Sequence, residues 1–231
     1  MPGDFDEIRK QDLIARLAEG HAAGITVVTP NRRLAQALAR EFDEGQVEKG
    51  LKVWETVDVL AFGAFVERRY EDALYAEGAG GFPQLLAPAQ ERALWEAVLA
   101  GQPLLSVEQA AADCAEAWRL AHAWRIAGAL DRFAGSEDTQ AYARWARDYA
   151  KRCRKEGFAD SAVLPDLISK SENKRPKLLV AYGFDILPPQ TRDLLKAFDV
   201  ALCHPDSKKS EAKRISFPSA RHELEAAARW A

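Results

Sequence analysis

The sequence predicts an α/β protein in which a parallel sheet is interrupted by a large all-helical insertion. Residues 178–181 form a continuous apolar run after a basic, proline-containing lead, which is the pattern of a strand that helices bury on both faces. Residues 25–28 and 199–204 are further strand candidates, whereas residues 85–168 show successive helical patterns and no strand pattern. Parallel strands need crossover connections, so we expect these strands to share one sheet.

The chain of 231 residues accordingly divides into three parts. We assign residues 1–84 to the first half of the α/β domain, residues 85–173 to the helical insertion, and residues 174–231 to the second half and the start of a further domain. The last residues stop within a helical pattern, as in a piece cut from a longer protein. Three residues are expected on neighbouring or near-neighbouring strands: Val27, Val53 and Val180.

The first half begins with an amphipathic helix from Asp4 to Glu19, with no strand before it and with a glycine, Gly20 or Gly24, as its stop. The β-branched strand Ile25–Val28 follows. Thr29 then suits the N-cap of a second helix, because its hydroxyl can accept a backbone N–H and Pro30 suits the first helical position. The expected apolar stripe of that helix is Leu34, Leu38 and Phe42.

A second short strand is expected at Leu51–Trp54. Thr56 can cap a helix that runs to about Ala76, with four apolar residues inside: Phe62, Phe65, Val66 and Leu74. In the insertion, Pro88 suits the first turn of a helix, and a helix that begins after Ser136 ends at Gly157.

Four tryptophans of the insertion lie on helical stripes, which favours the core over base stacking: Trp95, Trp118, Trp124 and Trp145. The cations of Lys151–Lys155 end the last long helix and offset its dipole there, and a patch that binds a nucleic-acid backbone is the alternative interpretation.

The second half contains the apolar strand and the turn at its carboxyl end. Gly183 lets the backbone turn sharply, and the pair Pro188 and Pro189 precedes a helix near Gln190. A buried strand at Asp199–His204 follows. Arg214–Phe217 is expected as a last strand, before a helix at His222–Trp230.

The carboxyl edge of this sheet carries the candidate binding residues. Free N–H groups and the positive dipole end at a helix start favour a phosphate, and adjacent guanidiniums add charge-assisted hydrogen bonds. The residues in these positions are Thr29, Asn31, Arg32 and Arg33. Alternatively, Thr29 only caps the helix, and the two arginines are solvated or pair with acidic neighbours.

The segment that ends the apolar strand resembles the degenerate Walker B segment of the AddB and RecC type subunits of bacterial helicase-nucleases. Its residues are Tyr182, Gly183, Phe184 and Asp185, followed after two residues by Pro188, Pro189 and Gln190. The strand, Thr-Pro and arginine-bearing helix near Thr29 resemble motif Ia of superfamily 1 helicases, which contacts single-stranded DNA in that family. The acidic residue that holds Mg²⁺ in active relatives corresponds to Tyr182, and no GxxxxGK[ST] loop is present.

This resemblance implies a P-loop-helicase-like fold without ATPase residues. The chain would act as a scaffold or a guide for single-stranded DNA in a DNA repair protein, beside a helicase-nuclease partner subunit, and a nuclease domain would lie beyond this chain. We expect no enzymatic activity, no cofactor and no metal. The alternatives are an α/β enzyme that binds a nucleotide or metabolite near Gly183 and Thr29, and a protein interaction module without DNA contact.

The sequence also argues against three other classes of protein: membrane proteins, disulfide-rich or zinc-binding proteins, and nucleases. No apolar run approaches the roughly 20 residues that cross a bilayer, so we expect a cytoplasmic protein with no membrane contact. The three cysteines are widely spaced and indicate neither a disulfide framework nor a zinc site. Pro165-Asp166 with Glu172-Asn173-Lys174 matches a loose nuclease pattern, but five intervening residues are too few for two strands, and we interpret the match as a coincidence around a short helix.

Overall fold

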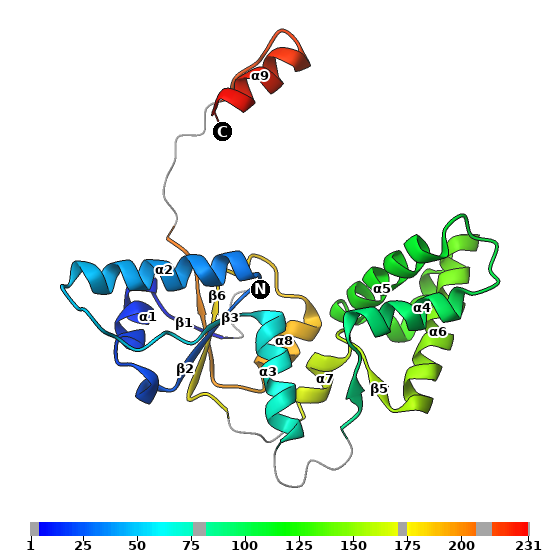
Figure 1. Cartoon of the computed structure of the whole chain (residues 1–231), viewed down its shortest axis with the longest axis horizontal. Coiled ribbons are helices and arrows are strands. Elements are labelled where there is room, and N and C mark those ends of the chain that lie inside the picture. The colour runs from blue at the N-terminus through cyan, green and yellow to red at the C-terminus, as the bar shows by residue number, and fades with distance from the viewer. Residues whose placement is uncertain (1–4, 76–81, 171–174, 207–213, 231) are drawn as a thin grey trace.

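A five-stranded sheet forms the body of the protein in the computed structural model, which describes residues 5–75, 82–170, 175–206 and 214–230 (Figure 1). The strands are β1 (Asp6–Glu7), β2 (Ile25–Thr29), β3 (Val59–Ala61), β6 (Leu178–Tyr182) and β7 (Val200–Cys203). Their order is β1-β7-β6-β2-β3, and every pairing is parallel. The predicted α/β class and parallel sheet are therefore confirmed.

Helices cover both faces of this sheet, as its apolar central strands require. Helices α1 (Lys10–Leu17) and α2 (Arg32–Glu48) pack on one face, with Leu13, Leu38 and Phe42 fully buried or nearly so. Helices α3 (Phe62–Leu74), α7 (Leu164–Ile168) and α8 (Pro189–Leu195) share a core cluster with the other face.

The register of the sheet confirms one part of the predicted strand pairing and corrects another. Val27 of β2 lies opposite Val180 of β6, as expected. Its partner on the other side is Val59, not Val53, because Leu51–Trp54 is not a strand. The Trp54 indole instead donates to Asp43 of α2 over 2.7 Å, and Val53 is 87% exposed, so this segment runs beside α2 outside the sheet.

The ends of the α/β body differ from the sequence prediction in two more places. A strand does precede the first helix, because Asp6 and Glu7 pair with Ala201 and Leu202, and α1 begins only at Lys10. Arg214–Phe217 has no regular structure, whereas the last helix is present as α9 (Ala220–Trp230). None of the side chains described in α9 is buried, and this helix lies apart from the sheet in Figure 1.

A helical block lies in the chain between β3 and β6. It contains α4 (Pro88–Leu99), α5 (Val107–Ala123), the 3-10 segment η2 (Ala127–Phe133) and α6 (Glu137–Glu156). Ser136 caps α6 and Gly157 ends it, as predicted. The expectation that this region has no strand is wrong, because β4 (Gln84–Leu85) and β5 (Phe158–Ala159) pair in parallel where the chain enters and leaves the block.

Aromatic rings form the centre of this block, as expected for three of the four tryptophans. Trp95 is fully buried and stacks on Tyr149, with ring centroids 4.0 Å apart, and Trp118 meets both rings edge to face. Trp145 packs at the margin of the same cluster. Trp124, in contrast, lies after the end of α5 and is 47% exposed. Leu74, which was also expected inside, is 40% exposed at the end of α3.

Polar contacts join the helical block to the sheet. Arg125 follows α5 with a left-handed φ of 61°, the position at which a helix end usually has glycine. Its guanidinium donates to Asp166 of α7 over 2.6 Å and to Asp193 of α8 over 2.7 Å. We call this contact the Arg125 fork.

Candidate nucleic-acid interface

The carboxyl edge of the sheet has a topological switch point between β2 and β6. The chain passes from β2 outward to β3 on one side and from β6 outward to β7 on the other. In open parallel sheets, ligands bind outside the carboxyl ends of the strands at such a point. The residues that follow β2 and β6 therefore lie where the fold class places a binding site.

The crevice at this switch point is filled by the protein itself. Gly183 follows β6 with a φ of 72°, and a Cβ at this position would lie 2.6 Å from Cδ2 of Leu34 and 3.4 Å from Cγ of Pro205. The first turn of α2 and the loop after β7 thus pack directly over the Gly183 backbone. This packing disfavours the alternative in which a nucleotide or metabolite enters the sheet between Gly183 and Thr29.

The N-terminus of α2 lies beside this closed crevice, and Asn31 caps it. The Asn31 side chain accepts from Leu34 N over 2.9 Å, whereas Thr29 is fully buried and its hydroxyl donates to the carbonyl of Asn31 over 2.8 Å. The prediction that Thr29 caps the helix is therefore wrong. The Thr29 side chain is also buried away from any ligand at the surface, while Asn31 is exposed.

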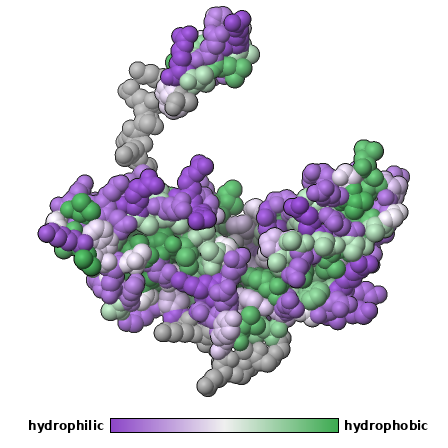
Figure 2. Space-filling model, in the orientation of Figure 1, coloured by the Kyte–Doolittle hydropathy of each residue, from purple (hydrophilic) through white to green (hydrophobic). Residues whose placement is uncertain are grey.

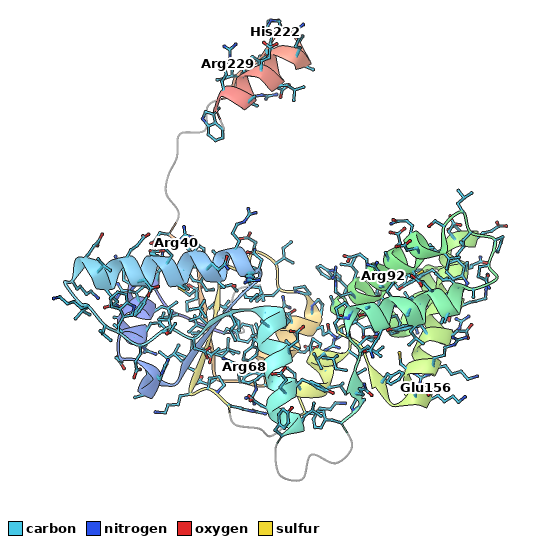
Figure 3. The ribbon with its side chains drawn as sticks, in the orientation of Figure 1. Arg40, Arg68, Arg92, Glu156, His222 and Arg229 are labelled. Carbon is cyan, nitrogen blue, oxygen red and sulfur yellow. The ribbon has the colours of Figure 1, made fainter. Side chains whose placement is uncertain are left out.

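The two arginines of the first turn are exposed. In the described part of the chain, no carboxylate forms an ion pair with Arg32 or Arg33, and their backbone N–H groups have no recorded protein acceptor. Pairing with acidic neighbours, the alternative considered from the sequence, is not observed. Arg40 lies two turns further along the outer face of α2 (Figure 3), and this face is hydrophilic in the space-filling view (Figure 2).

The residues of the Walker B resemblance lie in different environments. Tyr182 is 3% exposed between the sheet and helices α1 and α2, and burial raises the pKa of its phenol although the nearby Lys10 ammonium opposes this shift. Phe184 packs edge to face on Phe62, with ring centroids 6.4 Å apart, and Asp185 is exposed. These side chains do not converge on one ligand position.

Lys10 was not anticipated from the sequence, although it lies at the same edge. Its ammonium is 2.6 Å from a carboxylate oxygen of Glu41 and 3.5 Å from one of Asp206. Only two residues, Ile8 and Arg9, connect β1 to the helix that Lys10 begins. A phosphate-binding loop of the Walker type needs a longer, glycine-rich connection before a helix.

Asp166, the aspartate of the loose nuclease pattern, has a structural role. One carboxylate oxygen accepts from Arg125 and the other from the Gln190 side chain, over 2.6 and 2.9 Å. The expected short helix is α7, whereas Glu172, Asn173 and Lys174 lie outside the described residues. Within the described ranges, no three His, Cys, Asp or Glu side chains are placed to hold a metal ion.

None of the helices in the described ranges has the length and apolar character to cross a membrane. No protein-family model matches the chain, and no curated protein sequence matches it significantly.

Proposed function

We propose that the chain is a non-catalytic, helicase-like domain that guides single-stranded DNA across the carboxyl edge of its sheet. The observation that carries this proposal is the pair of exposed guanidiniums of Arg32 and Arg33, on a capped helix start at the switch point, which form no ion pair with any described carboxylate. Phosphates are attracted by such N-termini and by guanidiniums together. The closed crevice under Leu34 favours a ligand that lies on the surface, as a strand backbone does.

The stripe of polar residues along α2 supports a backbone ligand in particular. Arg32, Gln36 and Arg40 follow one another at intervals of four residues on one face, and each is exposed. Phosphates that repeat along a strand can contact such a stripe without any readout of base sequence. We therefore include Asn31, Arg32, Arg33 and Arg40 in the interface and leave out Thr29.

Within this proposal, the chain is one part of a cytoplasmic DNA repair protein and works beside a helicase-nuclease partner subunit. The helical block between β3 and β6 is then the insertion of a helicase-like domain, and α9, which exposes Leu224 and Trp230, begins the next domain. A protein interaction module without DNA contact is the remaining alternative, and the binding experiment below distinguishes the two.

Replacing Arg32 and Arg33 by alanine is expected to weaken binding of single-stranded DNA across all sequences. Each lost phosphate contact lowers the salt slope of log K by roughly 0.7 for single strands, so the double variant should lose about 1.4. Fold stability should change little, because surface substitutions usually cost within about 0.5 kcal/mol. The measurement is fluorescence anisotropy of a labelled oligonucleotide at several salt concentrations.

The matched control is the double variant Lys49→Ala and Lys52→Ala, which removes two exposed charges at the other end of α2. The helix has 17 residues, so the two pairs are separated by roughly 25 Å. Equal losses in both variants would reduce the effect to net charge and remove Arg32 and Arg33 from the interface. Absence of binding by the parent chain at low salt would favour the interaction module.

We also expect no DNA-stimulated hydrolysis of ATP. The short connection from β1 to α1, the engagement of Lys10 with Glu41 and Asp206, and the buried phenol of Tyr182 support this expectation. Phosphate release should stay at the level of the buffer with and without single-stranded DNA. Turnover that disappears in a Tyr182→Phe variant would instead place a nucleotide site at this edge.

A further inference from the structure

The helical block contains a hollow of about 570 Å³ between α5, η2 and α6. We call it the α6 hollow. Its size lies within the range of sites for small molecules, roughly 300 to 1,000 Å³. Small residues make the space, because several positions that face it have little or no side chain: Ala127, Gly128, Ala143, Ala146 and Ala150.

Two aromatic rings form one wall of the α6 hollow. Trp118 and His122 of α5 meet edge to face with centroids 4.3 Å apart, and both line the space. The Trp118 indole N–H donates a hydrogen bond to Asp160, whereas the buried Nε2 of His122 has no hydrogen-bond partner among the described residues. Burial lowers the pKa of His122, which favours the neutral imidazole. An apolar, partly aromatic wall of this kind suits a flat ring.

Charged side chains form the other wall, and its three cations outnumber its two carboxylates, Asp131 and Asp148. Arg147, Lys151 and Arg154 of α6 line the hollow at helical spacing, near the end of the helix that Glu156 marks in Figure 3. Arg147 pairs with Asp131 of η2 across the opening. Lys151 and Arg154 are exposed and have no recorded ion pair in the described ranges. These two side chains offer the charge-assisted hydrogen bonds that a phosphate requires.

We propose that the α6 hollow binds a nucleotide unit, with the base against the Trp118 side and the phosphate at Lys151 and Arg154. A free nucleotide and one nucleotide of a single strand share this chemistry. The hollow lies in the helical block, away from the switch point of the sheet, and the proposal does not require the interface on α2 to be correct.

The experiment uses the full chain and two probes, thymidine 5′-monophosphate in equilibrium dialysis and a labelled oligothymidylate in anisotropy. Thymidine and inorganic phosphate, each alone, should bind at least about tenfold more weakly than the monophosphate, because each supplies one half of the contacts. The double variant Lys151→Ala and Arg154→Ala should weaken binding at least about tenfold.

Two further variants separate the hollow from a general charge effect. Arg152→Ala with Lys155→Ala removes the same charge from adjacent α6 positions that do not line the hollow, and it should change affinity by less than about twofold. Gly128→Leu fills the space without changing charge, since a Cβ at Gly128 would meet no atom within 4 Å. It should weaken binding as much as the charge variant while the circular dichroism spectrum stays unchanged.

The outcomes are distinguishable. Equal losses in the two charge variants, or full binding by Gly128→Leu, would overturn the α6 hollow as the site. Binding of the oligonucleotide but not the monophosphate, with the same response to the variants, supports the hollow and identifies the strand as the source. If the parent chain binds neither the monophosphate nor the oligonucleotide, the proposal is wrong. In a chain with Arg32→Ala and Arg33→Ala, monophosphate binding should persist, so this proposal and the proposed function can fail separately.

Discussion

Replacing Asp160 by alanine is expected to destabilise the helical block by about 3 kcal/mol or more. Asp160 is 2% exposed and accepts three hydrogen bonds, from the Trp118 indole over 2.9 Å and from the backbone N–H groups of Ala162 and Val163 over 2.9 and 3.1 Å. Each buried donor left without a partner costs roughly 1 to 3 kcal/mol. The loss is measurable as a shift of the urea midpoint followed by near-UV circular dichroism.

A second change identifies the cause of this loss. Trp118→Phe removes one donor and leaves the Asp160 carboxylate with its two backbone partners. Asp160→Ala should therefore cost less in the Trp118→Phe background than in the parent chain, by about 1 kcal/mol or more. Equal costs in the two backgrounds would contradict the assignment of the indole contact.

The Asp160 variants should also alter the dependence of stability on pH. Burial first, and the charge of Asp160 second, raise the pKa of Glu91 on α4 from 4.5 to about 7. The folded chain then holds a proton in this window that the unfolded chain has released, so stability falls as pH rises from about 4.5 to about 7. Asp160→Asn removes the neighbouring charge and should flatten this fall, whereas an unchanged slope would assign the pH dependence to other groups.

Replacing Gly183 by alanine is expected to cost about 2 to 5 kcal/mol in the stability of the sheet. A left-handed φ of 72° costs a residue with a Cβ roughly 1 to 2 kcal/mol. The new Cβ would also lie 2.6 Å from Cδ2 of Leu34, so the first turn of α2 must shift, and such overpacking typically costs roughly 1 to 3 kcal/mol.

The two causes can be separated with Leu34→Ala, which removes the Leu34 Cδ2 atom 2.6 Å from the new Cβ and leaves only the ordinary 3.4 Å contact with Pro205. In that background, Gly183→Ala should cost only the backbone part, and the coupling energy between the two sites should exceed about 0.5 kcal/mol. Additive losses would show that Leu34 does not close the crevice. Because Arg32 and Arg33 lie on the same turn, the single variant should also weaken binding of single-stranded DNA if the proposed function is correct.

The central strands were predictable because their signal is local. Ile25–Thr29 is rich in β-branched residues and Leu178–Tyr182 is an apolar run, and the two pair as neighbouring strands, as expected; the caps Ser136 and Gly157 follow from single residue types. Asp6–Glu7 gave no such signal, since a two-residue edge strand is defined by its partner β7 and not by its own side chains. Leu51–Trp54 has a strand-like composition, but the hydrogen bond from Trp54 to Asp43 holds the segment beside α2 and outside the sheet.

The candidate interface was predictable only in part. A helix start after a strand could be read from Thr29, Pro30 and Asn31, but the sequence does not distinguish which of the polar residues caps it. The contact between Leu34 and Gly183 joins residues about 150 positions apart, and no local pattern indicates it. Arg125 was also missed. Glycine normally marks a left-handed position at a helix end, and this position has arginine instead.

The Arg125 fork has a consequence for the cooperativity of unfolding. Its three side chains are between 33% and 55% exposed, and ion pairs at such positions contribute about 1 kcal/mol or less. The aromatic cluster around Trp95 and the two cores on the sheet are separate clusters of buried apolar residues, whereas the Arg125 fork is a polar contact between them. Heating should therefore melt the helical block and the sheet as two overlapping calorimetric transitions. Asp160→Ala would lower the midpoint of one transition, and Gly183→Ala would lower that of the other.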